Sequence, residues 1–342
     1  MKPVSVSICI PVYNGGTYLL DCLESALAQH FQDYEIIVVD DGSTDGSYEL
    51  LEQYSLKYAK LKLYRNEVNR GLVGNWNRCL ELASGTWIKY LFQDDLLDPD
   101  CLQKMVDAGG QGNALIVSGR NFRIEDHVPP ALKHYFEHEV LSLERILPGT
   151  GLTFLPPESV SRLAVKYTCL NFIGEPTTVM FRKSLSSELG LFDKALAQIC
   201  DLEYWLRIGS RYGLAVISKS LTTFRVHTAS ATFNTINSRK FSASCADPAI
   251  VSGKLLYDPL FSGFREALRL PDRLRLKEYH YLKLYESILF HQSFPDQVTA
   301  QWEVIKTFPK FEKVRKGRVR TKLFFRIIQK RRQQTSKGGS TL

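Results

Sequence analysis

Two pairs of adjacent carboxylates, Asp40–Asp41 and Asp94–Asp95, each follow an apolar run in the first third of the chain. Mg²⁺ and Mn²⁺ select hard oxygen ligands of this kind, and substrate phosphates usually complete their coordination. Two neighbouring carboxylates also repel each other unless a cation or a hydrogen-bond donor meets them, and the imide N–H of uracil is one such donor. Together the pairs indicate metal-assisted chemistry on a nucleotide. For either pair alone, helix capping or a solvated loop is the alternative.

The apolar runs have the lengths of strands, and amphipathic stretches separate them. Strands are predicted near residues 4–10, 35–40, 61–66, 87–92 and 114–118, and helices near 17–29, 45–58, 73–83 and 99–107. This alternation is typical of an α/β fold with a parallel sheet and helices on both faces. Ligands bind such sheets at the carboxyl ends of the strands, so both acid pairs are expected at one edge.

The alternation of apolar and amphipathic stretches becomes irregular after residue 119 and resumes at residue 174. A second block at 174–227 contains a predicted strand at 177–182, a helix at 201–212 and a strand at 221–226. From about residue 258 the pattern is mainly helical, notably at 273–290 and 318–332. We therefore expect one domain over 1–230, divided at residue 120 into a nucleotide-binding half and an acceptor half, and a helical region over 231–342.

Composition indicates a globular protein of a reducing compartment. Of the 342 residues 44% are hydrophobic, which is enough for a sizeable core. The seven cysteines are scattered and form no CxxC pair, which argues against a disulfide framework and a zinc site. No apolar run has the roughly 18 to 20 residues that span a bilayer, and no cleavage site follows the N-terminal apolar run. We expect a cytoplasmic protein.

The net charge of +8 comes mainly from one segment, 313–332, which holds ten Lys or Arg and no acid. Its basic residues fall on one side of a predicted helix and its apolar residues on the other, so peripheral contact with an anionic membrane on the inner face is one interpretation. A docked terminal helix and a disordered tail are the alternatives. Because no nucleic-acid motif accompanies the charge, nucleic acid is not an expected partner.

A set of short motifs carries a resemblance to a known family. In order, they are Ile8–Asn14, Ile37–Gly46, Asn69–Gly71, Asn75–Asn77, Ala83–Gly85 and Gln93–Asp95. The ordered set closely resembles the family-2 inverting glycosyltransferases of the GT-A fold, and the block 174–227 is similar to a later part of these enzymes. The resemblance implies a Rossmann-like, mostly parallel sheet flanked by helices, with a mainly helical C-terminal extension.

The resemblance also implies roles in binding the nucleotide of a donor sugar. Asp41 matches the acid that reads the pyrimidine imide, while Pro11 and Tyr13 match residues that line the base pocket. Asp94 matches the residue that approaches the ribose. Asp95 matches the ligand of a Mn²⁺ or Mg²⁺ ion that bridges the diphosphate.

Two positions depart from the family pattern near the diphosphate. Gln93 stands where many members have a third acid, and Trp76 stands where many have arginine, so Trp76 is expected in the core. Arg70 is a candidate for the missing positive charge. His227 matches a histidine that meets the metal or the diphosphate.

For the transfer step, inversion requires a base that takes the proton of the acceptor hydroxyl. Asp201 matches the base of the family, although it is also well placed to cap the helix that begins there. Glu175 resembles a residue that faces the donor sugar or the acceptor, with a plain loop acid as the alternative. Glu203 is a reserve candidate, expected first to pair with Arg207 one helical turn away.

The resemblance therefore implies an enzyme that moves a sugar from a UDP- or dTDP-sugar to a hydroxyl of a glycan or lipid-linked saccharide. A non-catalytic nucleotide-sugar or glycan-binding protein is the alternative, because Gln93 and Trp76 depart from the pattern although Asp95 and Asp201 keep it. A nucleotidyltransferase would need a glycine-rich phosphate loop after the first strand, and Tyr13–Gly16 is a poor one. A dehydrogenase would need GxGxxG there.

Overall fold

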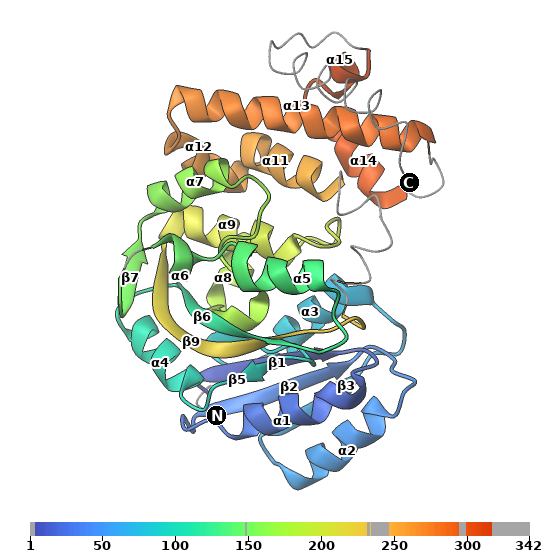
Figure 1. Cartoon of the computed structure of the whole chain (residues 1–342), viewed down its shortest axis with the longest axis vertical. Coiled ribbons are helices and arrows are strands. Elements are labelled where there is room, and N and C mark those ends of the chain that lie inside the picture. Colours follow the sequence, from blue (N-terminus) through green and yellow to red (C-terminus); the bar gives the residue numbers. More distant parts are fainter. Residues whose placement is uncertain (1–3, 148, 231–232, 234–245, 294–298, 317–342) are drawn as a thin grey trace.

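A computed structural model describes residues 4–147, 149–230, 233, 246–293 and 299–316 (Figure 1). Its centre is a nine-stranded sheet in the order β3-β2-β1-β4-β8-β6-β9-β5, with β7 paired to β9. The strands are β1 Val6–Val12, β2 Tyr34–Asp40, β3 Leu61–Arg65, β4 Trp87–Tyr90, β5 Leu96–Leu97, β6 Leu115–Ile124, β7 Leu152–Leu155, β8 Val179–Arg182 and β9 Leu214–Val226.

The first half of the chain folds as the sequence predicts. Strands β1 to β4 pair in parallel, and the helices between and after them are α1 Leu19–Leu27, α2 Ser47–Lys57, α3 Gly71–Leu82 and α4 Cys101–Gly110, with the short 3-10 helix η1 Gly16–Tyr18 before α1. Alternate residues of β1 face opposite sides of the sheet. Ile8 and Ile10 pack with α1 and α4, whereas Cys9 packs with α3.

The α/β fold class is as expected, with a parallel first half of the sheet, and the second half of the sheet is mixed. β8 lies between β4 and β6 and is antiparallel to both, β6 and β9 are parallel, and β5 and β7 are antiparallel to β9. The pattern of a single strand does not reveal the direction of its partner. Because β8 runs against β4, its first residues lie at the edge where β1, β2 and β4 end.

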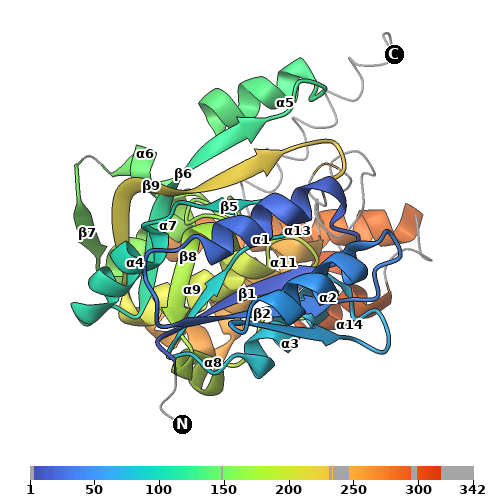
Figure 2. The same ribbon diagram turned by 90° about the horizontal axis from the view of Figure 1, so that it is seen from below.

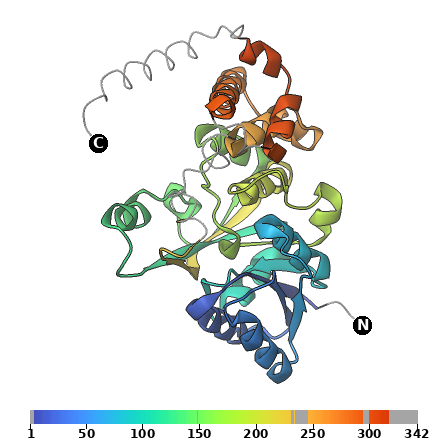
Figure 3. The same cartoon turned by 90° about the vertical axis from the view of Figure 1, so that its right-hand side faces the viewer.

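The segment after β6 contains α5 Pro130–His134, the π-helix Tyr135–Glu139, α6 Leu143–Ile146 and, after β7, α7 Pro157–Lys166. α6 and α7 contribute Leu143 and Val160 to the main core, whereas the π-helix contributes Phe136 to a separate small cluster. Figures 2 and 3 show α5 standing away from the layered body, beyond the ends of β6 and β9. It is attached by aromatic packing, since the ring of Phe136 lies 5.4 Å from Phe122 and 5.8 Å from Phe224.

The C-terminal helices form a layer on the other side of the sheet domain (Figure 1). The remaining helices are η3 Pro176–Thr178, α8 Ser184–Leu189, α9 Cys200–Tyr212, α11 Asp247–Tyr257, η5 Pro259–Phe261, α12 Ser262–Glu266, α13 Leu270–Ser293, α14 Thr299–Thr307 and α15 Phe311–Arg315. One hydrophobic core runs from Cys9 in β1 to Val314 in α15. The helical region and the sheet therefore share a core, and helix begins earlier than the predicted residue 258.

Three sequence expectations concern the surface and the cysteines. The predicted basic helix 318–332 lies outside the described residues, so membrane contact stays a prediction. Within the described ranges, no helix combines the length and the apolar character needed to cross a bilayer. The six cysteines that the structure describes have free thiols.

His280 on α13 should make the stability of the C-terminal layer depend on pH. Its buried Nδ1 lies 3.1 Å from the hydroxyl of Ser252 on α11, and burial lowers the pKa of this imidazole to about 3. The unfolded chain, with an ordinary pKa near 6.5, binds a proton that the folded chain does not. The contribution of neutral His280 to the free energy of unfolding is therefore fully present above about pH 6.5 and is lost as the pH falls toward 3.

We therefore expect the wild type to lose up to about 1.4 kcal/mol of unfolding free energy per pH unit more than His280→Gln between pH 6 and 4. Urea unfolding at several pH values measures the difference. His127→Gln, at an exposed position, is the control and should follow the wild type. Equal pH dependence of the wild type and His280→Gln would contradict the prediction.

Candidate active site

One edge of the sheet collects the predicted site residues. Strands β1, β2, β4 and β9 end there, and β8 begins there because it is antiparallel to β4. Glu175 precedes η3 and β8, and His227 directly follows β9. Segments that are more than a hundred residues apart in sequence therefore meet at this edge.

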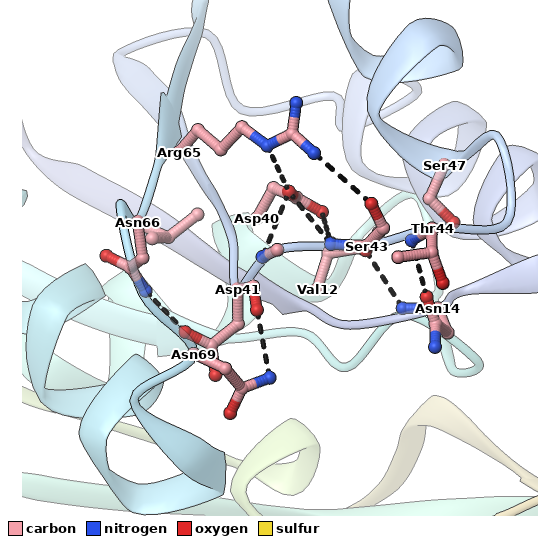
Figure 4. A network of polar contacts seen from close by, with 12 residues as sticks. Val12, Asn14, Asp40, Asp41, Ser43, Thr44, Ser47, Arg65, Asn66 and Asn69 are labelled. Atoms are coloured by element: carbon pink, nitrogen blue, oxygen red, sulfur yellow. Dashed lines mark hydrogen bonds and ion pairs between the residues drawn. The ribbon is translucent and has the colours of Figure 1, made fainter.

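The first acid pair divides into a structural residue and a pocket residue (Figure 4). Asp40 is fully buried, and its carboxylate accepts hydrogen bonds from the N–H groups of Gly42 and Ser43 and lies 3.3 Å from Arg65 Nε. A buried carboxylate needs such partners. Asp40 therefore holds the turn after β2, a role that the sequence did not separate from that of its neighbour.

Asp41 faces the start of α3. Its Oδ1 accepts hydrogen bonds from Asn66 Nδ2 at 2.7 Å and from the backbone N–H of Arg70 at 2.8 Å, and its carbonyl oxygen accepts one from Asn69 at 2.9 Å. These contacts fix the carboxylate while using one of its two oxygens. The side chain of Arg70 is exposed at the rim, so it is the backbone of this residue that contacts the predicted site.

Gln93 holds the loop that carries Tyr13. The backbone N–H of Tyr13 donates to Gln93 Oε1 at 2.9 Å, and Gln93 Nε2 donates to the carbonyl oxygen of Tyr13 at 3.1 Å. An ionised carboxylate accepts but cannot donate, so the neutral amide suits this two-way contact. The ring of Tyr13 stays half exposed, whereas Pro11 is buried in β1 opposite Val39.

Asp95 is buried at the junction of three strands. Its Oδ2 accepts a hydrogen bond from Thr177 Oγ1 at 2.6 Å, and its Oδ1 accepts one from the backbone N–H of Arg225 at 3.0 Å. Burial, and secondarily the charge of Asp94, raise the pKa of this carboxyl well above its usual range. Beneath it, the buried ammonium of Lys89 donates to the carbonyl oxygen of Thr177.

Asp94 is the accessible member of the second pair. Its side chain is 22% exposed, and its Oδ2 lies 3.0 Å from His227 Nε2. The imidazole of His227 packs at 4.3 Å on the ring of Tyr18, and its buried Nδ1 has no hydrogen-bond partner within the described part of the chain.

The donor set at this point tests the expected metal. Among the described residues no group of three or more His, Cys, Asp and Glu side chains could hold a metal ion. The pair Asp94–His227 fits a Mn²⁺ or Mg²⁺ ion whose remaining ligands are substrate oxygens and water. Asp95 fits less well, because its oxygens already accept protein hydrogen bonds. The geometry thus favours Asp94 over Asp95 as the carboxylate that faces an ion.

Asp201 is a buried carboxyl at the start of α9. It is 7% exposed, and Asn171 Nδ2 donates to its Oδ2 at 2.8 Å. Burial, opposed by the hydrogen bond from Leu202 N–H and assisted by the nearby charge of Glu175, raises its pKa to about 7. Ile199 occupies the N-cap position, so Asp201 lies one residue inside the helix instead of capping it. A carboxyl with a pKa near neutrality suits general-base chemistry.

Two polar residues of the site were not predicted. Asn171 links Asp201 to Gly174 through hydrogen bonds of 3.1 and 3.0 Å with the backbone of that glycine. Arg120 on β6 is buried, with its Nε 3.0 Å from Glu175 Oε2. Arg120 follows a predicted strand, so the edge argument could have found it, but no local signal identifies Asn171.

Two other predicted residues lie away from this edge. Glu203 is fully buried in an ion-pair cluster with Arg207, as expected for the helical pair, and with Lys254 Nζ at 2.9 Å. The carboxylate of Glu203 is therefore not exposed, which argues against the reserve role of this residue in substrate binding. Trp76 is a core residue as expected, and its ring lies 4.8 Å from Phe92.

Comparisons with known proteins agree with this architecture. The family model described as glycosyl transferase family 2 matches residues 7–190. An uncharacterized protein of Mycobacterium tuberculosis, MT1568, is 30% identical over 76% of this chain and 77% of its own length. An uncharacterized glycosyltransferase of Rickettsia typhi, RT0329, is 26% identical over 80% of this chain and 75% of its own length.

Among solved structures, S. aureus TarS 1–349 has a similar fold. It superposes with a TM-score of 0.56 at 17% identity, covering 92% of this chain and 88% of TarS 1–349. The same TarS fragment in complex with UDP-GlcNAc superposes with a TM-score of 0.51 at 17% identity and the same coverage. At this identity the likeness concerns the fold.

The contact between Thr177 and Asp95 should stabilise the junction of the strands. Thr177→Val keeps the shape of the side chain but removes the hydroxyl that donates to the buried carboxylate. We expect the free energy of unfolding to fall by about 1–3 kcal/mol, the cost of an unsatisfied buried polar group. Urea unfolding measures it. Thr177→Ser keeps the hydroxyl and serves as the control; equal stability of the Val and Ser variants would show that the hydrogen bond contributes little.

Proposed function

This chain belongs to glycosyl transferase family 2, and from that premise we propose that it transfers a sugar with inversion from a UDP-sugar to a hydroxyl group of an acceptor. One observation carries the proposal: a single short segment, 171–177, contacts both carboxyls, since Thr177 Oγ1 donates to Asp95 and Asn171 Nδ2 donates to Asp201. The carboxyl groups of the expected diphosphate site and of the expected base are therefore held by the same segment at one sheet edge.

For the donor, we propose a uridine nucleotide bound at the ends of β1 and β2. Asp41 has its Oδ1 occupied by protein donors, and its other oxygen would accept the imide N–H of uracil. The half-exposed ring of Tyr13 would stack on the base. The S. aureus TarS fragment with a similar fold has been solved with UDP-GlcNAc, which supports a UDP-sugar for this chain too. A dTDP-sugar presents the same imide.

At the diphosphate, Asp94 and His227 would hold the Mn²⁺ or Mg²⁺ ion. Bound there, such an ion would supply Lewis-acid neutralisation of the charge on the leaving diphosphate. Asp95 would not contact the ion. Its hydrogen bonds to Thr177 and to the backbone of Arg225 would fix the position of its neighbour Asp94. This moves to Asp94 the metal-binding role that the family resemblance implied for Asp95.

In the transfer step, Asp201 would take the proton of the acceptor hydroxyl as that oxygen attacks the anomeric carbon opposite the diphosphate. Asn171 would orient the carboxylate through its hydrogen bond to Oδ2. Direct displacement needs no covalent intermediate.

For the acceptor, we propose a hydroxyl of a glycan or lipid-linked saccharide. Glu175, held by the buried Arg120, is the candidate residue on the acceptor side of the site. The irregular segment between β6 and α7 adjoins this side and would supply further acceptor contacts.

The donor class and the metal can be tested together by thermal unfolding with a panel of UDP-, dTDP- and GDP-sugars, each with and without Mn²⁺. A ligand at a hundred times its Kd adds about 2.7 kcal/mol to the stability of the folded state. We expect a UDP-sugar to raise Tm by a few degrees with Mn²⁺ and clearly less without it. Asp94→Asn should lose the metal-dependent part, while Asp107→Asn, at an exposed position on α4, should keep it. Equal shifts with and without metal would overturn the proposed diphosphate site.

The base can be tested through the pH dependence of transfer. Asp201 must be ionised to accept a proton, so with a pKa of about 7 the rate should be low below pH 7 and rise to a plateau above it. Asp201→Asn should lower kcat by at least about a hundredfold, the lower range for general-base catalysis, and leave UDP affinity unchanged. Transfer rates between pH 5.5 and 8.5, with the donor found by the panel, measure both. Retained turnover in Asp201→Asn would place the base elsewhere.

A further inference from the structure

The start of α9, the helix that carries Asp201, is held by contacts from another helix. Ile199 occupies the N-cap position of α9 and its apolar side chain accepts no capping hydrogen bond, while within the first turn Asp201 Oδ1 accepts one from Leu202 N–H. Backbone N–H groups at a buried helix entrance need acceptors. In this protein the acceptor comes from the C-terminal helical layer.

Asp247, the first residue of α11, supplies that acceptor. Its fully buried carboxylate accepts hydrogen bonds from three consecutive backbone N–H groups, through Oδ2 from Ala197 at 3.0 Å, Gln198 at 2.6 Å and Ile199 at 3.2 Å. Gln301 Nε2 on α14 donates to its Oδ1 at 3.0 Å. Backbone N–H groups bind an ionised carboxylate more strongly than a neutral acceptor. A negative charge before the start of α9 also meets the positive end of its dipole.

A second residue of α11 holds the segments on both sides of this entrance. Lys254 Nζ donates to Asp193 Oδ2 at 2.6 Å, before the loop, and to Glu203 Oε1 at 2.9 Å, within α9. Asp201 therefore lies in a stretch of chain that α11 contacts at three places. Figure 1 shows α11 directly above α9.

We propose that Asp247 is a positioning residue for the transfer reaction. By collecting the N–H groups of residues 197–199 it fixes the first turn of α9 and, with it, the carboxylate of Asp201. A displacement of about 1 Å at a reacting group can cost a hundredfold in rate. The inference rests on the role proposed for Asp201, and it assigns to the C-terminal layer a part in catalysis beyond its part in the core.

The test uses Asp247→Asn in the full chain. The amide keeps the volume of the side chain but places an NH₂ group where a carboxylate oxygen now accepts hydrogen bonds. We expect kcat to fall about 10- to 100-fold, the range for misplacing a catalytic group, while KM for the donor and UDP affinity with Mn²⁺ stay unchanged. Ser252→Ala is the matched control, because Ser252 is buried on the same helix but bonds to His280 and not to the loop. It should keep the wild-type kcat.

Hydrogen exchange gives a readout that does not depend on activity. The amides of residues 197–199 should exchange faster in Asp247→Asn than in the wild type or Ser252→Ala. Wild-type kcat and exchange in a folded Asp247→Asn would overturn the proposal, and so would an equal loss of UDP affinity and kcat, which would indicate general damage. If the wild type transfers no sugar from any donor, the proposed function fails, and the exchange experiment still decides whether Asp247 holds the loop.

If Asp247→Asn does not fold, Gln301→Ala takes its place. This change removes the hydrogen bond that Gln301 donates to Oδ1, so the carboxylate is held less firmly against the three loop N–H groups. It should speed exchange at residues 197–199 and lower kcat several-fold, with KM for the donor unchanged. Exchange and kcat equal to those of the wild type would overturn the proposal.

Discussion

The buried carboxylate of Asp95 is the contact on which the rest of the site depends. A buried polar group must be met by hydrogen-bond partners, and the partners come from two distant segments, Thr177 before β8 and the backbone of Arg225 in β9. Satisfying Asp95 therefore brings the ends of β4 and β9 and the start of β8 to one point. Its neighbour Asp94 is left accessible, beside the His227 that follows β9.

The two acid pairs share a division of roles. In each pair the two carboxylates meet different parts of the fold: Asp40 binds the turn while Asp41 faces α3, and Asp95 binds the strands while Asp94 meets His227. Asp40 ends β2, whereas Asp94 and Asp95 lie in and just after the turn that follows β4, so the local backbone directs the two side chains of each pair to different partners. Neighbouring acids at a sheet edge are therefore not equivalent ligands.

The surroundings of Asp201 belong to two layers of the protein. The family match ends at residue 190, while Asp201 and the C-terminal helices lie beyond it. A common hydrophobic core joins these helices to the sheet, and the polar contacts of Asp247 and Lys254 lie within that junction. Burial raises the pKa of Asp201 to about 7, so the packing that positions this residue also sets its basicity.

The sequence by itself determined the strand and helix order of the first half and the residue types at the sheet edge, because periodicity and motif spacing are local properties. The tertiary structure decided the antiparallel insertion of β8, the different roles of Asp94 and Asp95, and the partners of Asp201. These depend on contacts between distant residues: Asp95 and Arg225 are 130 positions apart, and Ile199 and Asp247 are 48 apart. A sequence shows that a carboxylate is present, but only the fold selects the N–H groups that meet it.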